Sequence, residues 1–129
     1  MWVEEMKNRQ IVEILKNGGV VCVPTDTVWG VGAAISSGGG VRKLYRAMER
    51  DETKPTAVLV SRMEMARKYG KFDEKAISLA RKNWPGGLTV VVEAKEKVPR
   101  EILGGARKVG LRLPDHDGLV RMIDELGEG

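Results

Sequence analysis

Two hydroxyl groups and a carboxylate stand in a row at Thr25, Asp26 and Thr27, directly after an apolar run. Polar groups at the end of a buried strand commonly meet ligands. Thr25 and Thr27 could therefore hydrogen-bond a substrate or a bound anion, with Asp26 ranking behind them. Gly30 and Gly32 follow, and glycine lets a backbone approach a ligand closely. The alternative is a turn in which the side chains satisfy only local backbone groups.

Three side chains farther along the chain could add to this chemistry. Arg112 alternates with apolar residues over 109–113, which places it on the opposite strand face from the leucines. Its planar guanidinium fits a carboxylate in a bidentate fashion, although a salt bridge at the strand end is an equally good interpretation. Thr89 follows a Pro-Gly-Gly break and could face the same ligand, although threonine is also an ordinary strand former. His116 is the only histidine, so we predict no histidine cluster for a metal and expect it to neighbour a helix cap.

The elements that must position these residues alternate between helix and strand, which predicts an α/β fold. Apolar residues recur with helical spacing in some segments and cluster or alternate in others. Helices are predicted at about 3–16, over Val41, Leu44, Tyr45 and Met48, at 63–68, at 74–83, as one turn at 98–102, and over Leu119, Met122, Ile123 and Leu126; strands are predicted at 20–23, 57–60, 88–92 and 109–113.

Turn formers and capping residues mark the expected boundaries. Residues 17–19 stop the first helix, and Pro24 ends the first strand, which is expected to be buried on both faces with Cys22 as an inert buried thiol. Residues 36–40 are predicted to form a flexible turn. Asp115 or Asp117 is available as the N-cap of the last helix.

The bulk composition predicts one domain spanning 1–129, because 129 residues at 42% hydrophobic and 31% charged suit a single core. No run of about 18 apolar residues and no charged-apolar leader is present, so we expect a cytoplasmic protein without a membrane segment. A single cysteine forms no internal disulfide. The net charge of +4 is a mild signal that leaves both solvated helical faces and a nucleic-acid surface open.

Four segments together resemble the YrdC-like family, the threonylcarbamoyl-AMP synthases of tRNA modification. Residues 23–32 resemble its signature P-T-[DE]-T-x-[YF]-G-x-G. Arg50 with Lys54 and Pro55 is similar to its K-x-R…KP segment, residues 84–89 to W-P-G-P-[LYF]-T, and residues 109–116 to V-[GA]-[VIL]-R-x-P-x-[HD]. The matches keep the family's order from about Ile11 to the last residue. The chain is therefore identified as a member of this family, which implies an open twisted mixed sheet flanked by helices in a single domain.

The resemblance implies a reaction in which L-threonine, bicarbonate and ATP form threonylcarbamoyl-adenylate, with release of pyrophosphate, for threonylcarbamoyladenosine formation at position 37 of tRNA. Such an adenylyl transfer requires positioning and cations. Arg50 and Lys54 would neutralise the triphosphate of ATP, and Mg²⁺ held largely by phosphate oxygens is expected. Arg112 would grip the threonine carboxylate. Thr25, Thr27 and Thr89 would complete the substrate site. Implied partners are tRNA or double-stranded RNA and other tRNA-modification proteins.

Two departures from the family pattern leave the activity of this chain open. Met48 stands where the pattern has lysine two residues before Arg50, and packing on the apolar stripe of its helix would explain a methionine there. No S-x-N, the motif of a later nucleotide-binding strand, occurs in the chain, so we expect a truncated product or a short family member. The alternative function is a non-catalytic module that binds double-stranded RNA, tRNA or nucleotide. A third possibility is a fragment that self-associates through an open sheet edge.

Overall fold

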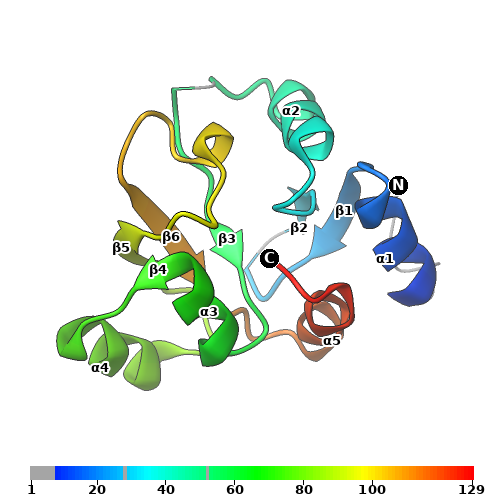
Figure 1. Ribbon diagram of the computed structural model, residues 1–129. Coiled ribbons are helices and arrows are strands. Elements are labelled where there is room, and N and C mark those ends of the chain that lie inside the picture. The colour runs from blue at the N-terminus through cyan, green and yellow to red at the C-terminus, as the bar shows by residue number, and fades with distance from the viewer. Residues whose placement is uncertain (1–7, 28, 52) are drawn as a thin grey trace.

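The computed structural model describes residues 8–27, 29–51 and 53–129, and it has the α/β architecture expected from the sequence (Figure 1). Helices and strands alternate along most of the described chain. The helices are α1 (Asn8–Lys16), α2 (Gly38–Ala47), α3 (Met63–Tyr69), α4 (Glu74–Asn83), the 3-10 turn η2 (Arg100–Ile102) and α5 (Asp117–Leu126). The strands are β1 (Val21–Pro24), β2 (Trp29–Gly32), β3 (Val58–Leu59), β4 (Gly70–Lys71), β5 (Val90–Ala94) and β6 (Lys108–Arg112).

The described strands form two sheets. β1 and β2 pair as an antiparallel hairpin, and the second sheet has the order β3-β6-β5-β4. In that sheet β3 runs parallel to β6 while the other pairs are antiparallel, so the expected mixed sheet is confirmed. Strand β2 was not predicted, because its two glycines weaken the strand pattern.

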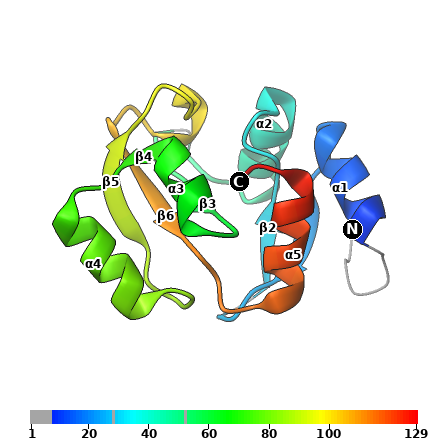
Figure 2. The same ribbon diagram turned by 60° about the horizontal axis from the view of Figure 1, so that its bottom comes forward.

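Helices cover each sheet on one side and together enclose a contiguous core (Figure 2). α3 and α4 supply Met65, Ala66 and Ala80 against the four-stranded sheet, whose Val109 and Leu111 are 1% and 0% exposed. α1 and α5 pack against each other beside the hairpin. The packing of α1 and α5 beside the hairpin therefore supports its polar turn.

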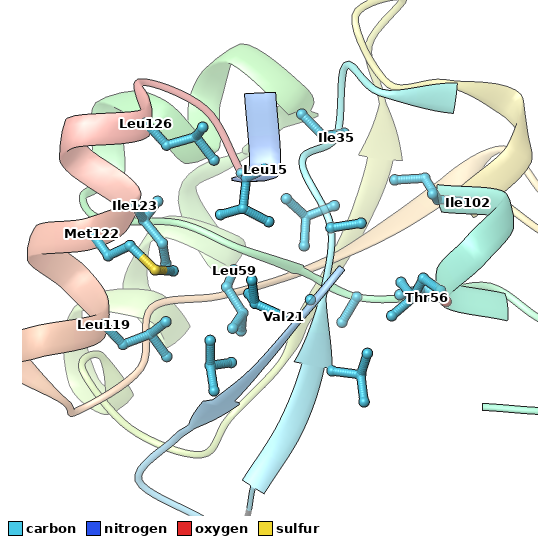
Figure 3. Close-up of a pocket in the computed structure, with 18 residues that line it drawn as sticks. Leu15, Val21, Ile35, Thr56, Leu59, Ile102, Leu119, Met122, Ile123 and Leu126 are labelled. Carbon is cyan, nitrogen blue, oxygen red and sulfur yellow. The ribbon is translucent and has the colours of Figure 1, made fainter. Parts of the chain in front are cut away.

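An apolar cavity of about 150 Å³ lies between the hairpin and β3. Figure 3 shows Leu119, Met122 and Ile123 of α5 pointing toward Leu59 of β3 and Val21 of β1 across this space. The two sheets thus meet through apolar side chains in this region.

None of the described helices is long and apolar enough to cross a membrane.

Several predicted boundaries hold. α4 begins at Glu74 and ends at Asn83 as expected, because Asp73 accepts a hydrogen bond from the Ala76 N–H and Pro85 follows the helix. α3 and η2 also form where helix was predicted. β3 is shorter than the predicted 57–60, and β5 lies two residues later than the predicted 88–92. The expected start of the first helix near residue 3 lies outside the described residues.

Other sequence predictions at helix ends and in β1 are wrong. Residues 38–40 begin α2 instead of forming a turn, because Ser37 caps them by accepting the Gly40 N–H. Met48 does not pack: the helix ends at Ala47, and Met48 is 54% exposed as the C-cap. His116, not an aspartate, is the N-cap of α5, with Nδ1 accepting the Leu119 N–H at 3.1 Å. Cys22 is only half-buried, because β1 has one covered face.

Candidate functional site

An ion pair between Asp26 and Arg112 joins the hairpin turn to the end of β6. The Arg112 Nη1 group donates to Asp26 Oδ1 at 2.7 Å, and the two side chains are 9% and 13% exposed for Arg112 and Asp26. Because the pair is largely withdrawn from water, each charge depends on the other. The salt bridge that the sequence analysis considered for Arg112 is therefore present. Its partner is Asp26, which we considered a weaker ligand-binding candidate than Thr25 and Thr27.

The same two side chains tie three loops together. Asp26 Oδ2 accepts the backbone N–H of Asp115 at 3.0 Å, and Arg112 Nη1 also donates to the carbonyl of Gly86 at 3.0 Å. The Gly86 N–H in turn donates to the Leu113 carbonyl at 2.9 Å. The hairpin turn, the Pro-Gly-Gly loop before β5 and the loop after β6 are thus connected at one point. We call these contacts the Asp26–Arg112 latch.

The electrostatics of the latch favour the ionised carboxylate. Burial by itself raises the pKa of Asp26, but the hydrogen bond from the Asp115 N–H and the hydrogen bond and charge of Arg112 act in the opposite direction and outweigh it. The pKa of Asp26 is therefore lower than the ordinary value of 3.8. A group whose pKa is depressed by folding contributes stability above its unfolded-state pKa and loses that contribution as pH falls.

This shift predicts that the latch weakens in acid. The stability difference between the wild-type chain and Asp26→Asn should be largest near neutral pH and should shrink as pH falls below about 4, where protonation removes the charge in the unfolded and then the folded state. Urea denaturation of both chains between about pH 6 and pH 3 measures this difference. A gap of constant size over the whole range would show that the charge of Asp26 does not contribute.

The predicted hydroxyl groups lie around the latch. The Thr25 and Thr27 hydroxyls are 3.0 Å apart, and Thr25 Oγ1 also accepts the Thr27 N–H at 3.1 Å, so the local turn proposed as an alternative is present. Thr27 Oγ1 is also 3.5 Å from Arg112 Nη2. Continuing the β5–β6 register, in which Val90 is opposite Leu111, places Thr89 opposite Arg112. The structure therefore brings these four predicted residues to one end of the sheets.

Arg50 and Lys54 lie elsewhere. The segment that carries them precedes β3, and β3 runs parallel to β6 with Leu59 opposite Arg112. Lys54 is five residues before Leu59, which corresponds to about 16 Å of extended chain. In Figure 1 the segment between α2 and β3 lies at the top of the view, above the strands. Arg50 and Lys54 are both exposed, and their segment leads into the end of β3 opposite to the end that lies beside Arg112.

Arg50, Asp51, Thr53 and Lys54 each take part in a short hydrogen bond. Arg50 Nη2 donates to the Pro55 carbonyl at 2.5 Å, and the buried Tyr45 donates its hydroxyl to the Lys54 carbonyl at 2.8 Å. Asp51 Oδ1 accepts from the backbone N–H and the hydroxyl of Thr53, and these bonds lower the pKa of Asp51. The Arg50 guanidinium and the Lys54 carbonyl are therefore each held by a hydrogen bond, the second to Tyr45 of α2. Within the described ranges no cluster of three or more His, Cys, Asp or Glu side chains could hold a metal ion.

Comparison with known proteins shows the family of this chain. The family model described as Telomere recombination, which covers the Sua5, YciO and YrdC proteins, matches residues 13–129. The chain is 33% identical over 123 residues to the threonylcarbamoyl-AMP synthase of Pyrococcus abyssi, covering 95% of this chain and 36% of that protein. It is 35% identical over 115 residues to the human threonylcarbamoyl-AMP synthase, covering 89% of this chain and 40% of that protein.

The solved structures give the same result. The structure of P. abyssi Sua5 complexed with L-threonine superposes with a TM-score of 0.90 at 31% identity, covering 94% of this chain and 36% of that one. E. coli YciO superposes with a TM-score of 0.86 at 26% identity, covering 95% and 61%. The chain therefore spans less than half the length of the synthases it matches. Because the family match extends over nearly all of the described chain and the fold agrees with it, this protein belongs to the Sua5/YciO/YrdC family.

Proposed function

We propose that this chain acts as a threonylcarbamoyl-AMP synthase, joining L-threonine, bicarbonate and ATP for threonylcarbamoyladenosine formation in tRNA. The observation that most supports this proposal is the convergence of Thr25, Thr27, Thr89 and Arg112 at one end of the two sheets. The names of the curated relatives, and the L-threonine complex of the similar P. abyssi protein, favour the same substrate class.

Threonine would bind at this convergence. Arg112 Nη1 is engaged by Asp26 and by Gly86, so the carboxylate of threonine would meet the Nη2 group, whose contact with Thr27 Oγ1 is long at 3.5 Å. A carboxylate accepts well from a guanidinium, and threonine hydroxyls on the protein can donate to it as well. The latch would hold Arg112 in one orientation for this contact.

ATP would bring the other half of the chemistry. Carbamylated threonine attacks the α-phosphate and pyrophosphate leaves, so negative charge accumulates on the leaving group. Arg50 and Lys54 are exposed cations and would neutralise that charge. Magnesium would enter with the nucleotide, bound mainly through phosphate oxygens, which is its usual mode at phosphate-transfer sites.

Pyrophosphate release from ATP by the purified 129-residue chain tests the proposal, with threonine and bicarbonate omitted in turn. We expect release only when both are present. A folded chain that binds threonine or ATP but releases no pyrophosphate would contradict catalysis and support the binding module instead. Loss of release in Arg112→Lys, with ATP binding unchanged, would assign Arg112 to threonine and not to the nucleotide.

Restoring a lysine at position 48 should strengthen ATP binding. Met48 is 54% exposed at the end of α2 and two residues before Arg50, so a lysine there costs no core packing. A charged hydrogen bond to phosphate is worth about 1.5–3 kcal/mol, so Met48→Lys should lower the Kd for ATP about ten- to a hundredfold. Calorimetric titration measures this, with the neutral Met48→Gln of similar length as the matched control. Equal shifts in both variants would show that the cation is not responsible.

A second candidate function rests on the outer face of α2. Arg42, Lys43 and Arg46 are exposed on this helix, whose buried side is apolar. Clustered cations on one helical face favour a polyanion such as double-stranded RNA or tRNA. A gel-shift titration with a short RNA duplex at two salt concentrations tests this binding. Unchanged binding after all three residues are replaced by glutamine would exclude this face.

A further inference from the structure

The outer edge of β5 extends beyond the strand that pairs with it. The Lys95 N–H donates to the Tyr69 carbonyl on the β4 side, and the Ala94 N–H donates to the Arg107 carbonyl on the β6 side, both at 2.8 Å. Because these directions alternate along a strand, the N–H and carbonyl of Val91 point to the β4 side. β4 ends at Lys71, which is opposite Glu93, so no β4 residue stands opposite Val91. Val91 therefore presents a backbone donor and acceptor at a sheet edge.

An open groove of about 800 Å³ runs along this edge between β5 and α4. Its wall includes Phe72 and three large apolar side chains that are unusually exposed, namely Leu79 at 43%, Leu88 at 39% and Val91 at 61%. Figure 2 shows β5 and α4 beside each other at the end of the molecule far from α1. The groove thus combines an apolar lining with backbone groups available for pairing, a combination that suits an extended peptide better than a globular surface.

The charges around the groove indicate the character of that peptide. Lys75, Lys95 and Lys108 line it. Of the carboxylates in the lining, Asp73 caps α4 through the Ala76 N–H, and Glu93 pairs with Lys71 at 3.3 Å. The charges of Glu93 and Lys71 cancel, so Lys75, Lys95 and Lys108 against Asp73 leave the groove with an excess of positive charge, and the Lys95 ammonium also donates to the Arg67 carbonyl at 2.7 Å. An acidic segment is complementary to this rim.

We propose that an extended acidic peptide segment of a partner protein binds here by adding a strand to β5. The backbone of the peptide pairs with Val91, its alternate apolar side chains contact Leu79 and Leu88, and its carboxylates face the lysine rim. The groove shares Thr89 with the proposed threonine site, whereas Asp26, Arg112, Arg50 and Lys54 do not line it. Val91 and Leu79, on which the tests below rest, have no role in the proposed synthase reaction.

A synthetic hexapeptide of alternating glutamate and valine, with blocked ends and a fluorescent label, tests the proposal by anisotropy at low salt. Val91→Pro removes the outward N–H, and because the N–H groups of Val90 and Val92 are the ones that face β6, the β5–β6 ladder is kept. Loss of one hydrogen bond should weaken binding about tenfold. The control Val91→Thr keeps the backbone donor and should bind as the wild-type chain does.

A second variant tests the proposal even if Val91→Pro fails to fold. Leu79→Glu changes an exposed side chain on α4, so it should fold normally, and it places a like charge beside the acidic peptide. We expect it to lose binding, as should a peptide with lysine in place of glutamate. No binding by the wild-type chain, or equal binding by Val91→Pro and the wild-type chain, would overturn the proposal. An RNA duplex that displaces the peptide, and that binds Val91→Pro as tightly as the wild-type chain, would overturn the proposal and assign the lysines to nucleic acid.

Discussion

Replacing Asp26 with alanine should lower the free energy of unfolding by roughly 1–3 kcal/mol, because it leaves the buried Arg112 guanidinium without its carboxylate partner. Arg112 would then keep its charge with only 9% of its side chain exposed, and the Asp115 N–H would lose its acceptor. The pair joins segments 86 residues apart in the chain, so its loss also weakens the contact between the hairpin turn and the end of β6. Chemical denaturation monitored by circular dichroism measures the effect.

Two further variants show whether the stability cost of Asp26→Ala comes from the Asp26–Arg112 ion pair. Glu93→Gln breaks the Lys71–Glu93 pair, whose side chains are both 59% exposed, and should cost less than about 1 kcal/mol. The double variant Asp26→Ala with Arg112→Met removes both charges and should be more stable than Asp26→Ala alone. A cost for Asp26→Ala no greater than that of Glu93→Gln would show that the pair contributes little.

Replacing Gly104 with alanine should cost on the order of 3 kcal/mol and should also weaken ATP binding. Gly104 has φ +59°, a left-handed conformation, and a Cβ there would meet the Thr53 carbonyl oxygen, with the Pro55 nitrogen at 2.7 Å and the Lys54 carbonyl carbon at 2.8 Å. These are backbone atoms, which cannot rotate away as a side chain can. The Arg50–Lys54 segment must therefore move, and with it both proposed phosphate-binding cations. Denaturation and ATP titration measure the two effects.

The neighbouring glycine provides the control. Gly105 is also left-handed, at φ +83°, but a Cβ there meets nothing within 4 Å. Gly105→Ala should therefore cost only the conformational strain, about 1 kcal/mol, and should leave ATP binding unchanged. Similar losses in the two variants would mean that the close approach to residues 53–55 is not what matters at Gly104.

Local signals explain which elements could be predicted from the sequence. The bounds of α4 follow from an aspartate cap, apolar residues with helical spacing and a proline after its end, all within a few residues of each other. Met48 was misplaced because helical spacing alone does not show that the last turn ends at Ala47, one residue earlier. His116 was not predicted as the cap of α5, because aspartate is the usual capping residue and two aspartates flank it.

The candidate site shows the same division between local and long-range information. Thr25, Thr27, Thr89 and Arg112 could be singled out from their positions next to strands, because such positions commonly face ligands. The partner of Arg112 could not, since Asp26 lies far away in sequence and only the tertiary fold brings them together. The position of Arg50 and Lys54 relative to the other four could not be predicted either, because it depends on the parallel pairing of β3 with β6, and this pairing has no local signature.

The apolar cavity between the hairpin and β3 has a mechanical consequence. Hydrostatic pressure favours states that eliminate internal voids, and the unfolding volume change scales with the void that is lost. With about 150 Å³ of loosely packed apolar space at the join between its two sheets, this region should respond to pressure more than the close-packed interior around Val109 and Leu111. The methyl groups of Leu59, Met122 and Ile123, which line this space, should therefore be the first to change their NMR shifts as pressure rises.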